Sequence, residues 1–349
     1  MRKQMMNSKK QYRLYSCVWE ITLACCFSCQ YCGSRGGTAR KQELTTAECL
    51  DIAAQLSDLG CRRVSLIGGE VFMRADWPEI AMALTKHGMR VSIITNGYLL
   101  SEPLITQLKV AQIESVAVSL DGLEHIHDKY RQPGSFRRAV HAIQVLSQNG
   151  IPVSVISTLH HENVPELEEF YHLLCQWPIY AWQLQACSPM GNAVSSGVDY
   201  RFDPKKVIDF IASHMHDAPF AMGIADNIGY YTDQEGYLRG NLSGRSVFCG
   251  CGAGLHSVGI DSVGNVRGCE SMYNERFIEG NLREKTLREI WESPDSFRYN
   301  RIFRPDMLTG KCGTCEYGAL CAGGCRSYNY FVLGKLYEAP FCARMMPNV

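Results

Sequence analysis

The residues best suited to chemistry are three cysteines near the start of the chain. Cys25, Cys29 and Cys32 have the spacing Cys-x3-Cys-x2-Cys and follow an apolar stretch. Three thiolates on one short loop can hold three irons of a four-iron cluster, and the fourth iron then has no protein ligand. A small molecule can coordinate and react at that open iron. The spacing therefore predicts a redox-active 4Fe-4S cluster, whereas Cys26 is out of register and is expected to be a packed thiol.

Zinc is the alternative metal for this loop. A structural zinc needs four protein ligands, usually two separated pairs of cysteines or histidines. Here three cysteines lie within the eight residues 25–32. This close spacing favours an iron–sulfur cluster over zinc. Free buried thiols are the second alternative.

A second group of cysteines lies toward the C-terminus. Its members follow the order Cys251, Gly264-x4-Cys269, Cys312-x2-Cys315-x5-Cys321-x3-Cys325 and Cys342. Spacing alone leaves a zinc ribbon open for the Cys-x2-Cys and Cys-x3-Cys steps. The chain from 247 onward is rich in Gly and Cys and has few long apolar patterns, so metal ligation would have to supply its folding energy.

Composition limits the setting and the partners. The 349 residues include 35 Lys and Arg and 35 Asp and Glu, so a nucleic-acid or anionic membrane partner is not expected. No run of 18 apolar residues predicts a membrane span. The polar start of the chain does not resemble an export signal, and residues 1–11 are expected to be a flexible tail. Seventeen cysteines, an odd number, predict reduced metal-binding thiols and a cytoplasmic location.

The elements that position these cysteines alternate between strand and helix patterns. Strands are predicted at 17–23, 63–67, 91–95, 115–120, 153–158 and 182–186, and helices at 45–59, 78–87, 103–110, 136–149 and 165–175. This βαβα order predicts an α/β fold with parallel strands, a partial (β/α)6 TIM-like barrel followed by a small Cys-rich iron–sulfur domain. The predicted boundaries are 12–220 for the barrel, 221–246 for a linker and 247–349 for the second domain.

Short polar turns follow four of the predicted strands. They are Gly68-Gly69-Glu70, Thr95-Asn96-Gly97, Ser119-Leu120-Asp121-Gly122 and Pro189-Met190-Gly191-Asn192. Glycines let a backbone approach a ligand closely, and a carboxylate can pair with an ammonium group. Each turn alone is ordinary, but ligands bind at the carboxyl ends of parallel strands, where these turns and the first cysteines all fall.

The cysteine loop, with Tyr31 before its last cysteine, resembles the radical S-adenosylmethionine superfamily. In that family the open iron chelates S-adenosylmethionine, whose reductive cleavage gives a 5′-deoxyadenosyl radical that abstracts a substrate hydrogen. The chain departs from the family pattern at Val71, where Pro is frequent, and at Asn192, where Arg is common. The resemblance implies cofactor contacts by Tyr31, Gly68, Gly69, Glu70, Asn96, Ser119, Asp121, Pro189 and Gly191.

The C-terminal cysteines are similar to the seven-cysteine SPASM extension of that family. The resemblance implies two auxiliary iron–sulfur clusters. One would use Cys251, Cys269 and Cys325, with Cys249 as a possible fourth ligand, and the other would use Cys312, Cys315, Cys321 and Cys342. Glu270 matches the place of an acidic residue that is thought to take a proton from substrate in sulfatase-maturing enzymes. A hydrogen donor, if the reaction needs one, could be Cys26, Cys187 or Cys249.

The resemblance indicates the class of reaction but does not identify the substrate. We expect modification of a ribosomally made peptide by cross-linking or oxidation, with electrons from an external flavodoxin- or ferredoxin-type donor. Only 24 residues precede Cys25, so a separate leader-recognition protein, or no leader, is expected. The alternatives are a small-molecule dehydrogenase, epimerase or decarboxylase acting on an amino-sugar or tetrapyrrole, and a non-enzymatic iron–sulfur electron carrier.

Overall fold

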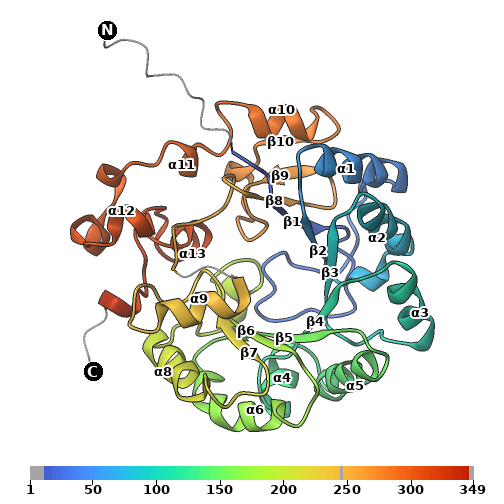
Figure 1. Ribbon diagram of the computed structural model, residues 1–349, viewed down its shortest axis with the longest axis horizontal. Coiled ribbons are helices and arrows are strands. Elements are labelled where there is room, and N and C mark those ends of the chain that lie inside the picture. The colour runs from blue at the N-terminus through green and yellow to red at the C-terminus, as the bar shows by residue number, and fades with distance from the viewer. Residues whose placement is uncertain (1–11, 244–246, 346–349) are drawn as a thin grey trace.

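One twisted sheet carries most of the molecule (Figure 1). The computed structural model describes residues 12–243 and 247–345. The strand order is β10-β9-β8-β1-β2-β3-β4-β5-β6-β7, and all neighbours from β8 to β7 are parallel. The strands are β1 (Ser16–Glu20), β2 (Arg63–Ile67), β3 (Arg90–Thr95), β4 (Ser115–Ser119), β5 (Val153–Leu159), β6 (Ala181–Ala186), β7 (Ala221–Ile224), β8 (Ser257–Ile260), β9 (Asn265–Arg267) and β10 (Gly280–Asn281). The α/β partial barrel with a cysteine-rich extension is thus confirmed.

Helices cover the outer face of the curved sheet (Figure 1). In the barrel they are α1 (Thr46–Asp58), α2 (Trp77–Lys86), α3 (Glu102–Val110), α4 (Glu124–Tyr130), α5 (Ser135–Gln148), α6 (Leu167–Leu174), α7 (Ala193–Ser196), α8 (Pro204–His214) and α9 (Glu235–Ser243). The cysteine-rich part adds α10 (Leu287–Glu292), α11 (Arg298–Arg301), α12 (Gly318–Cys321) and α13 (Arg326–Leu333). Helix α1 begins with a capping box in which Thr45 and Glu48 satisfy each other's backbone N–H groups.

The two faces of the sheet differ in character. On β2, Val64 and Leu66 are buried against the helices, whereas Ser65 between them is half-buried on the inner face. The hydroxyl of Ser65 lies 3.0 Å from that of Ser92 on the neighbouring strand β3. Small polar side chains on the inner face do not close the barrel in the way that large branched residues do. The inner face therefore leaves room for ligands at the carboxyl ends of the strands.

The structure adds a strand and a helix in the segment 221–246, for which the sequence predicts a linker or bridge. Residues Ala221–Ile224 form the strand β7, which pairs with β6, and Glu235–Ser243 form the helix α9. The segment 221–246 is therefore not a plain linker over its described part. Strand β8 pairs in parallel with β1, so the cysteine-rich part extends the barrel sheet instead of forming a sheet of its own. The predicted tail 1–11 lies outside the described residues, and the domain boundaries stay predictions.

Candidate active site

The first cysteine loop lies at the carboxyl end of β1. Two backbone hydrogen bonds close the loop, from Cys25 N to Gly37 O at 2.8 Å and from Gly37 N to Leu23 O at 3.0 Å. The thiols of Cys25, Cys29 and Cys32 are half-buried. Backbone N–H groups point at two of these sulfurs, from Phe27 to Cys25 at 3.4 Å and from Gly36 to Cys32 at 3.2 Å. Such donors stabilise a thiolate, which is the form that binds iron.

Gly68 and Gly69 bring the end of β2 against the chain that leads into this loop. A Cβ atom on Gly68 would lie 2.5 Å from Thr22 O, and one on Gly69 would overlap Ala24 O. Gly69 N donates to Thr22 O at 2.8 Å, and Glu70 N donates to Ala24 O at 2.7 Å. The two glycines are therefore required to position the cysteine loop, which is a role beyond the cofactor contact predicted for them.

Glu70 is buried beside the loop. Its carboxylate accepts hydrogen bonds from the Thr95 hydroxyl at 2.8 Å and from Asn96 N at 2.9 Å. Burial raises the pKa of Glu70 to about 7, although these hydrogen bonds favour the charged form. An ammonium group in contact with Glu70 would lower this pKa and favour the charged carboxylate. This fits the predicted contact between Glu70 and a cofactor amine.

Asn96 extends from the end of β3 to the same place. Its side-chain amide lies 3.4 Å from Cys26 Sγ and 4.0 Å from Cys25 Sγ. A hydrogen bond that Cys25 donates to Cys26, together with burial, raises the pKa of Cys25, and the same bond lowers the pKa of the accepting Cys26 to about 6. Glu70 and Asn96, which the sequence places 26 residues apart, thus meet at the first cysteines.

The turn after β6 supports the other end of the loop. Asn192 N donates to Cys32 O at 2.9 Å, and the Asn192 amide donates to Cys29 O at 2.9 Å. Gly191 has φ +57°, and a Cβ atom there would overlap Cys32 O. The predicted site residues Pro189 and Gly191 therefore belong to a turn that packs on the cysteine loop.

Neighbouring protein groups hold the Asp121 side chain. Its carboxylate is fully buried and accepts hydrogen bonds from the Tyr31 hydroxyl, from Arg131 and, at 2.9 Å, from Thr158 N. These hydrogen bonds give Asp121 a positioning role beside the cysteine loop, and its predicted contact with the cofactor stays a prediction. The predicted contact of Ser119, half-buried at the end of β4, stays a prediction. Sequence reasoning missed Arg131, although it lies in the same Ser-Leu-Asp-Gly-x5-Asp-x2-Arg run.

Two groups of thiols form in the cysteine-rich part. Cys251, Cys269 and Cys325 lie close enough for their charges to act on one another. Burial, and next the charge of Cys251, raise the pKa of Cys269 to about 12. The structure thus brings together three side chains that span more than 70 residues of sequence. Their shared position fits the first predicted auxiliary cluster.

The second group encloses a small cavity. It is lined by Cys312, Cys315, Cys321 and Cys342, together with the aromatic rings of Tyr230, Tyr231 and Tyr317. Burial, Cys342 and Cys312 raise the pKa of Cys321 to about 12. Four thiols around one apolar cavity match the donor set that a four-iron cluster needs.

Within residues 12–243 and 247–345, no three His, Cys, Asp or Glu side chains converge closely enough to hold a single metal ion. The Cys249 thiol is exposed and donates to Val247 O at 3.7 Å. Its ligand role stays a prediction.

Glu270 lies on the inner face of β8. Its Oε2 would be 2.7 Å from a Cβ atom on Gly259, so the glycine makes room for this carboxyl group. Both carboxyl oxygens are buried and have no hydrogen-bond partner within the part of the chain that the structure describes, and Arg267 Nη1 lies 4.0 Å away. Burial, with the nearby Glu20, raises the pKa of Glu270 well above its ordinary value. A carboxyl group in this state is suited to exchange a proton, and its role as a base stays a prediction.

The predicted hydrogen donors occupy three different environments. Cys26 lies beside Cys25, Cys187 is buried near Asp121, and Cys249 is exposed. Burial raises the pKa of Cys187 to about 12.

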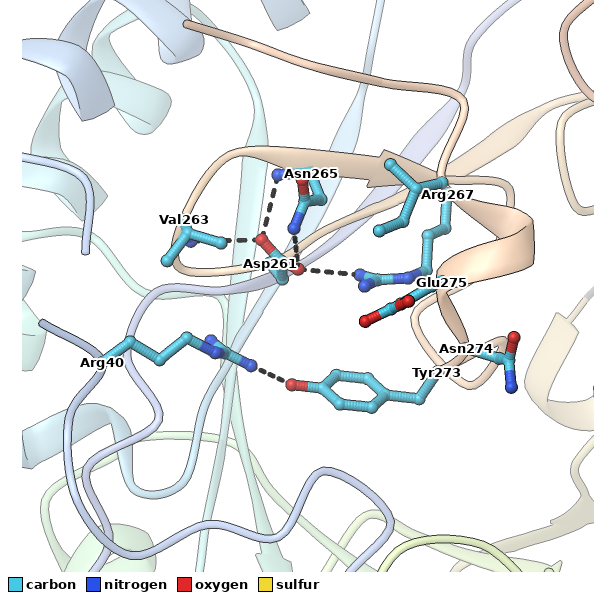
Figure 2. Close-up of a pocket in the computed structure, with 9 residues that line it drawn as sticks. Arg40, Asp261, Val263, Asn265, Arg267, Tyr273, Asn274 and Glu275 are labelled. Carbon is cyan, nitrogen blue, oxygen red and sulfur yellow. Dashed lines mark hydrogen bonds and ion pairs between the residues drawn. The ribbon is translucent and has the colours of Figure 1, made fainter. Parts of the chain in front are cut away.

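A polar pocket of about 480 Å³ opens at the β8–β9 edge of the sheet. Figure 2 shows Arg40 reaching from the cysteine-loop segment to the Tyr273 hydroxyl, while Arg267 bonds to Asp261 at 3.0 Å. Arg267 pairs with Gly259 in the strand register, so it shares the inner face with Glu270. The pocket therefore lies beside the predicted base, because its lining residue Arg267 has Nη1 4.0 Å from Glu270. Sequence reasoning missed it, because its walls come from segments more than 200 residues apart.

Comparison with known proteins agrees with this geometry. Residues 19–174 match the Radical SAM superfamily, and residues 249–316 match the iron-sulfur cluster-binding domain SPASM. The AdoMet-dependent heme synthase of Methanosarcina barkeri is 30% identical over 93% of this chain and 95% of its own length. Mycofactocin maturase MftC of Mycolicibacterium smegmatis is 28% identical over 90% of this chain and 78% of its own length. Streptococcus suis SuiB bound to S-adenosylmethionine has the same fold, with a TM-score of 0.75 and 17% identity over 95% of this chain and 77% of that one.

Fold and site together define an enzyme built on a partial α/β barrel with three groups of cysteine ligands. The chain belongs to the radical SAM superfamily and carries a SPASM domain. Its cofactors are S-adenosylmethionine, a 4Fe-4S cluster and auxiliary iron–sulfur clusters. When bound, the first cluster supplies the electron that cleaves S-adenosylmethionine to the hydrogen-abstracting 5′-deoxyadenosyl radical. The assignment of individual ligands stays a prediction that the grouping of the thiols supports.

Over the described ranges 12–243 and 247–345, no helix combines the length and apolar character needed to cross a bilayer.

Proposed function

We propose that this enzyme modifies a peptide, with hydrogen abstraction from the substrate followed by cross-linking or oxidation. The observation that carries the proposal is the pocket beside Glu270. Arg40, Arg267, Asp261 and Glu275 line it with balanced charges, and Asn274 adds an amide. A peptide backbone offers donors and acceptors in equal number and suits such a wall. The flat apolar face of a tetrapyrrole offers few donors and acceptors to such a wall.

Relatives support the same class of reaction. Proteins named mycofactocin maturase align over 90% of this chain, and a maturase converts a precursor into its finished form. SuiB, which shares only the fold, is known in complex with its precursor peptide SuiA. The proposal includes a cytoplasmic setting, an external flavodoxin- or ferredoxin-type electron donor and a separate leader-recognition protein.

Precursor peptides encoded beside the gene provide the test. Incubation with the reconstituted enzyme, S-adenosylmethionine and a reductant should change the mass of one peptide. Glu275→Ala should raise KM for that peptide several-fold and leave peptide-independent cleavage of S-adenosylmethionine unchanged. Glu284→Ala, an exposed glutamate outside the pocket, is the matched control. Active cleavage without any mass change in these peptides would contradict the proposal.

Decarboxylation of a tetrapyrrole side chain is the second candidate. Two relatives favour it, the heme synthase already described and a Fe-coproporphyrin III synthase that is 32% identical over 93% of this chain. Incubation with iron-coproporphyrin III should then release carbon dioxide and 5′-deoxyadenosine in matching amounts. Under the peptide proposal this substrate stays unchanged.

A further inference from the structure

Carboxyl groups gather behind the polar pocket at the β8–β9 edge. Strand β8 pairs in parallel with β1, and Val18 lies opposite Gly259. Side chains alternate between the two faces of a strand, so Glu20 and Asp261, each two residues farther along the chain, share that face. Glu270 uses the space that Gly259 leaves, where its Oε2 would be 2.7 Å from a Cβ atom. Three carboxyl groups from three separate segments therefore meet at the carboxyl ends of these two strands.

The two arginines of the pocket are already paired with groups of this cluster. Arg40 Nη1 lies 2.5 Å from Glu20 Oε1. Arg267 Nη1 donates to Asp261 Oδ2 at 3.0 Å and also lies 4.0 Å from Glu270 Oε1. One guanidinium group cannot neutralise two carboxyl groups. This side of the pocket therefore has more acidic groups than basic ones, although the charges on the pocket wall itself balance.

Three carboxyl oxygens of the cluster are unused. Oε2 of Glu20 and both carboxyl oxygens of Glu270 are buried and accept no hydrogen bond from any residue that the structure describes. The two residues are only 1% and 7% exposed. Burial raises the pKa of Glu20 above its ordinary value, although Arg40 lowers it. Buried oxygens without donors cost free energy, which a donor from outside the chain would recover.

Glu275 adds a fourth carboxyl group on the solvent side. Its side chain is exposed, and Figure 2 shows the carboxylate pointing into the pocket. A primary ammonium group carries three N–H donors, no acceptor and one positive charge. It therefore matches both the unused oxygens and the excess of acidic groups. A carboxylate would be repelled here, and a neutral amide would turn an acceptor oxygen toward other acceptors.

We propose that this pocket binds a primary ammonium group of the substrate peptide, with Glu20, Glu270 and Glu275 as its partners. The inference deepens the peptide proposal above and rests on it. A lysine side chain and the amino terminus of the peptide are the two sources of such a group. Contact with a cation favours the charged form of each carboxyl group, so binding supplies the positive charge that the folded chain lacks at this place.

Removal of each ammonium group from the peptide provides the test. The probe is the precursor peptide whose mass the enzyme changes, labelled with a fluorophore. Its binding to the full-length reconstituted enzyme is followed by anisotropy, with S-adenosylmethionine and without reductant. Norleucine in place of each lysine removes a side-chain ammonium group, and acetylation removes the terminal one. One of these changes should raise Kd about tenfold or more, because a charge-assisted hydrogen bond is lost.

Enzyme variants locate the partner of that ammonium group. Glu270→Gln and Glu275→Gln should each raise Kd for the unaltered peptide and leave Kd for the altered peptide unchanged. Glu284→Gln, at an exposed position outside the pocket, is the matched control and should bind both peptides like the unmodified enzyme. The readout is binding, so a role of Glu270 as a base does not enter it.

The outcomes separate this inference from the peptide proposal. If no precursor peptide changes in mass, the peptide proposal fails and this inference fails with it. If a peptide is modified but the loss of its ammonium groups does not change Kd, only the inference is overturned. The same holds if the glutamate variants weaken the binding of unaltered and altered peptides equally.

Discussion

The two ends of the chain hold cysteines in contrasting ways. At the first loop all three predicted ligands are half-buried, and backbone groups from the ends of β2 and β6 position the loop. At the second auxiliary group, Cys312, Cys321 and Cys342 are buried around a cavity with aromatic walls. A cluster that must admit a ligand needs an open side and precise support from a rigid sheet. A cluster that only carries electrons gains from enclosure.

The largest loss of activity is expected from a substitution in the first cysteine loop, and it tests how this loop differs from the enclosed group. Cys29→Ala should bring 5′-deoxyadenosine formation below detection, because a four-iron cluster with only two protein ligands is lost. Cys26→Ala is the matched control, since Cys26 lies in the same loop but outside the predicted ligand set. Chromatographic measurement of 5′-deoxyadenosine in reduced protein decides between them. Equal losses of 5′-deoxyadenosine formation in the two variants would show that the ligands are assigned to the wrong cysteines.

A smaller effect is expected at the enclosed group. Cys315→Ala should abolish product formation but leave part of the cleavage of S-adenosylmethionine, because the first loop is built by other elements. The readouts are 5′-deoxyadenosine and product in the same reaction. Cys175→Ala, a half-buried thiol at the end of α6, should change neither. Complete loss of cleavage in Cys315→Ala would mean that the two cysteine regions do not have separate roles.

The smallest effect concerns a surface link between the two regions. Arg283 donates to both carboxylate oxygens of Glu48 on α1, and to the backbone of Gln42 and Glu43. Both side chains of the ion pair are about one-third exposed, so Arg283→Ala should lower the free energy of unfolding by less than about 1 kcal/mol. Iron content and cleavage should stay the same. Denaturant titration monitors this effect, and a loss of iron would show that the surface link supports the clusters.

Local patterns in the sequence were sufficient for much of this site. The Cys25–Cys32 spacing and the Gly68-Gly69 pair each depend on neighbours within a few residues. Their consequences therefore appear at the predicted places. The alternation of strands and helices likewise predicts a parallel sheet, because parallel neighbours need crossover helices.

Contacts between distant segments could not be predicted in the same way. Asp121 looks like a ligand-binding residue in its turn, and only the folded chain shows that Arg131 and Tyr31 use its carboxylate. The short strand β7 has no long apolar pattern in the sequence. Its strand conformation depends on pairing with β6, which the sequence does not show. No local pattern in the sequence links Gly259 to Glu270. In the fold, Gly259 has no side chain and so leaves room for the Glu270 carboxyl group.

The pairing of β8 with β1 limits how this protein can be rearranged. Val18 and Gly259 are partners in that register, 241 positions apart along the chain. Removal of everything after 246 would make β1 the edge strand of the remaining sheet, with its hydrogen-bonding groups uncovered. Unprotected edges of this kind promote pairing between chains and aggregation. The cysteine-rich part is therefore not a detachable module, and a shortened barrel would need a substitute strand to cover this edge.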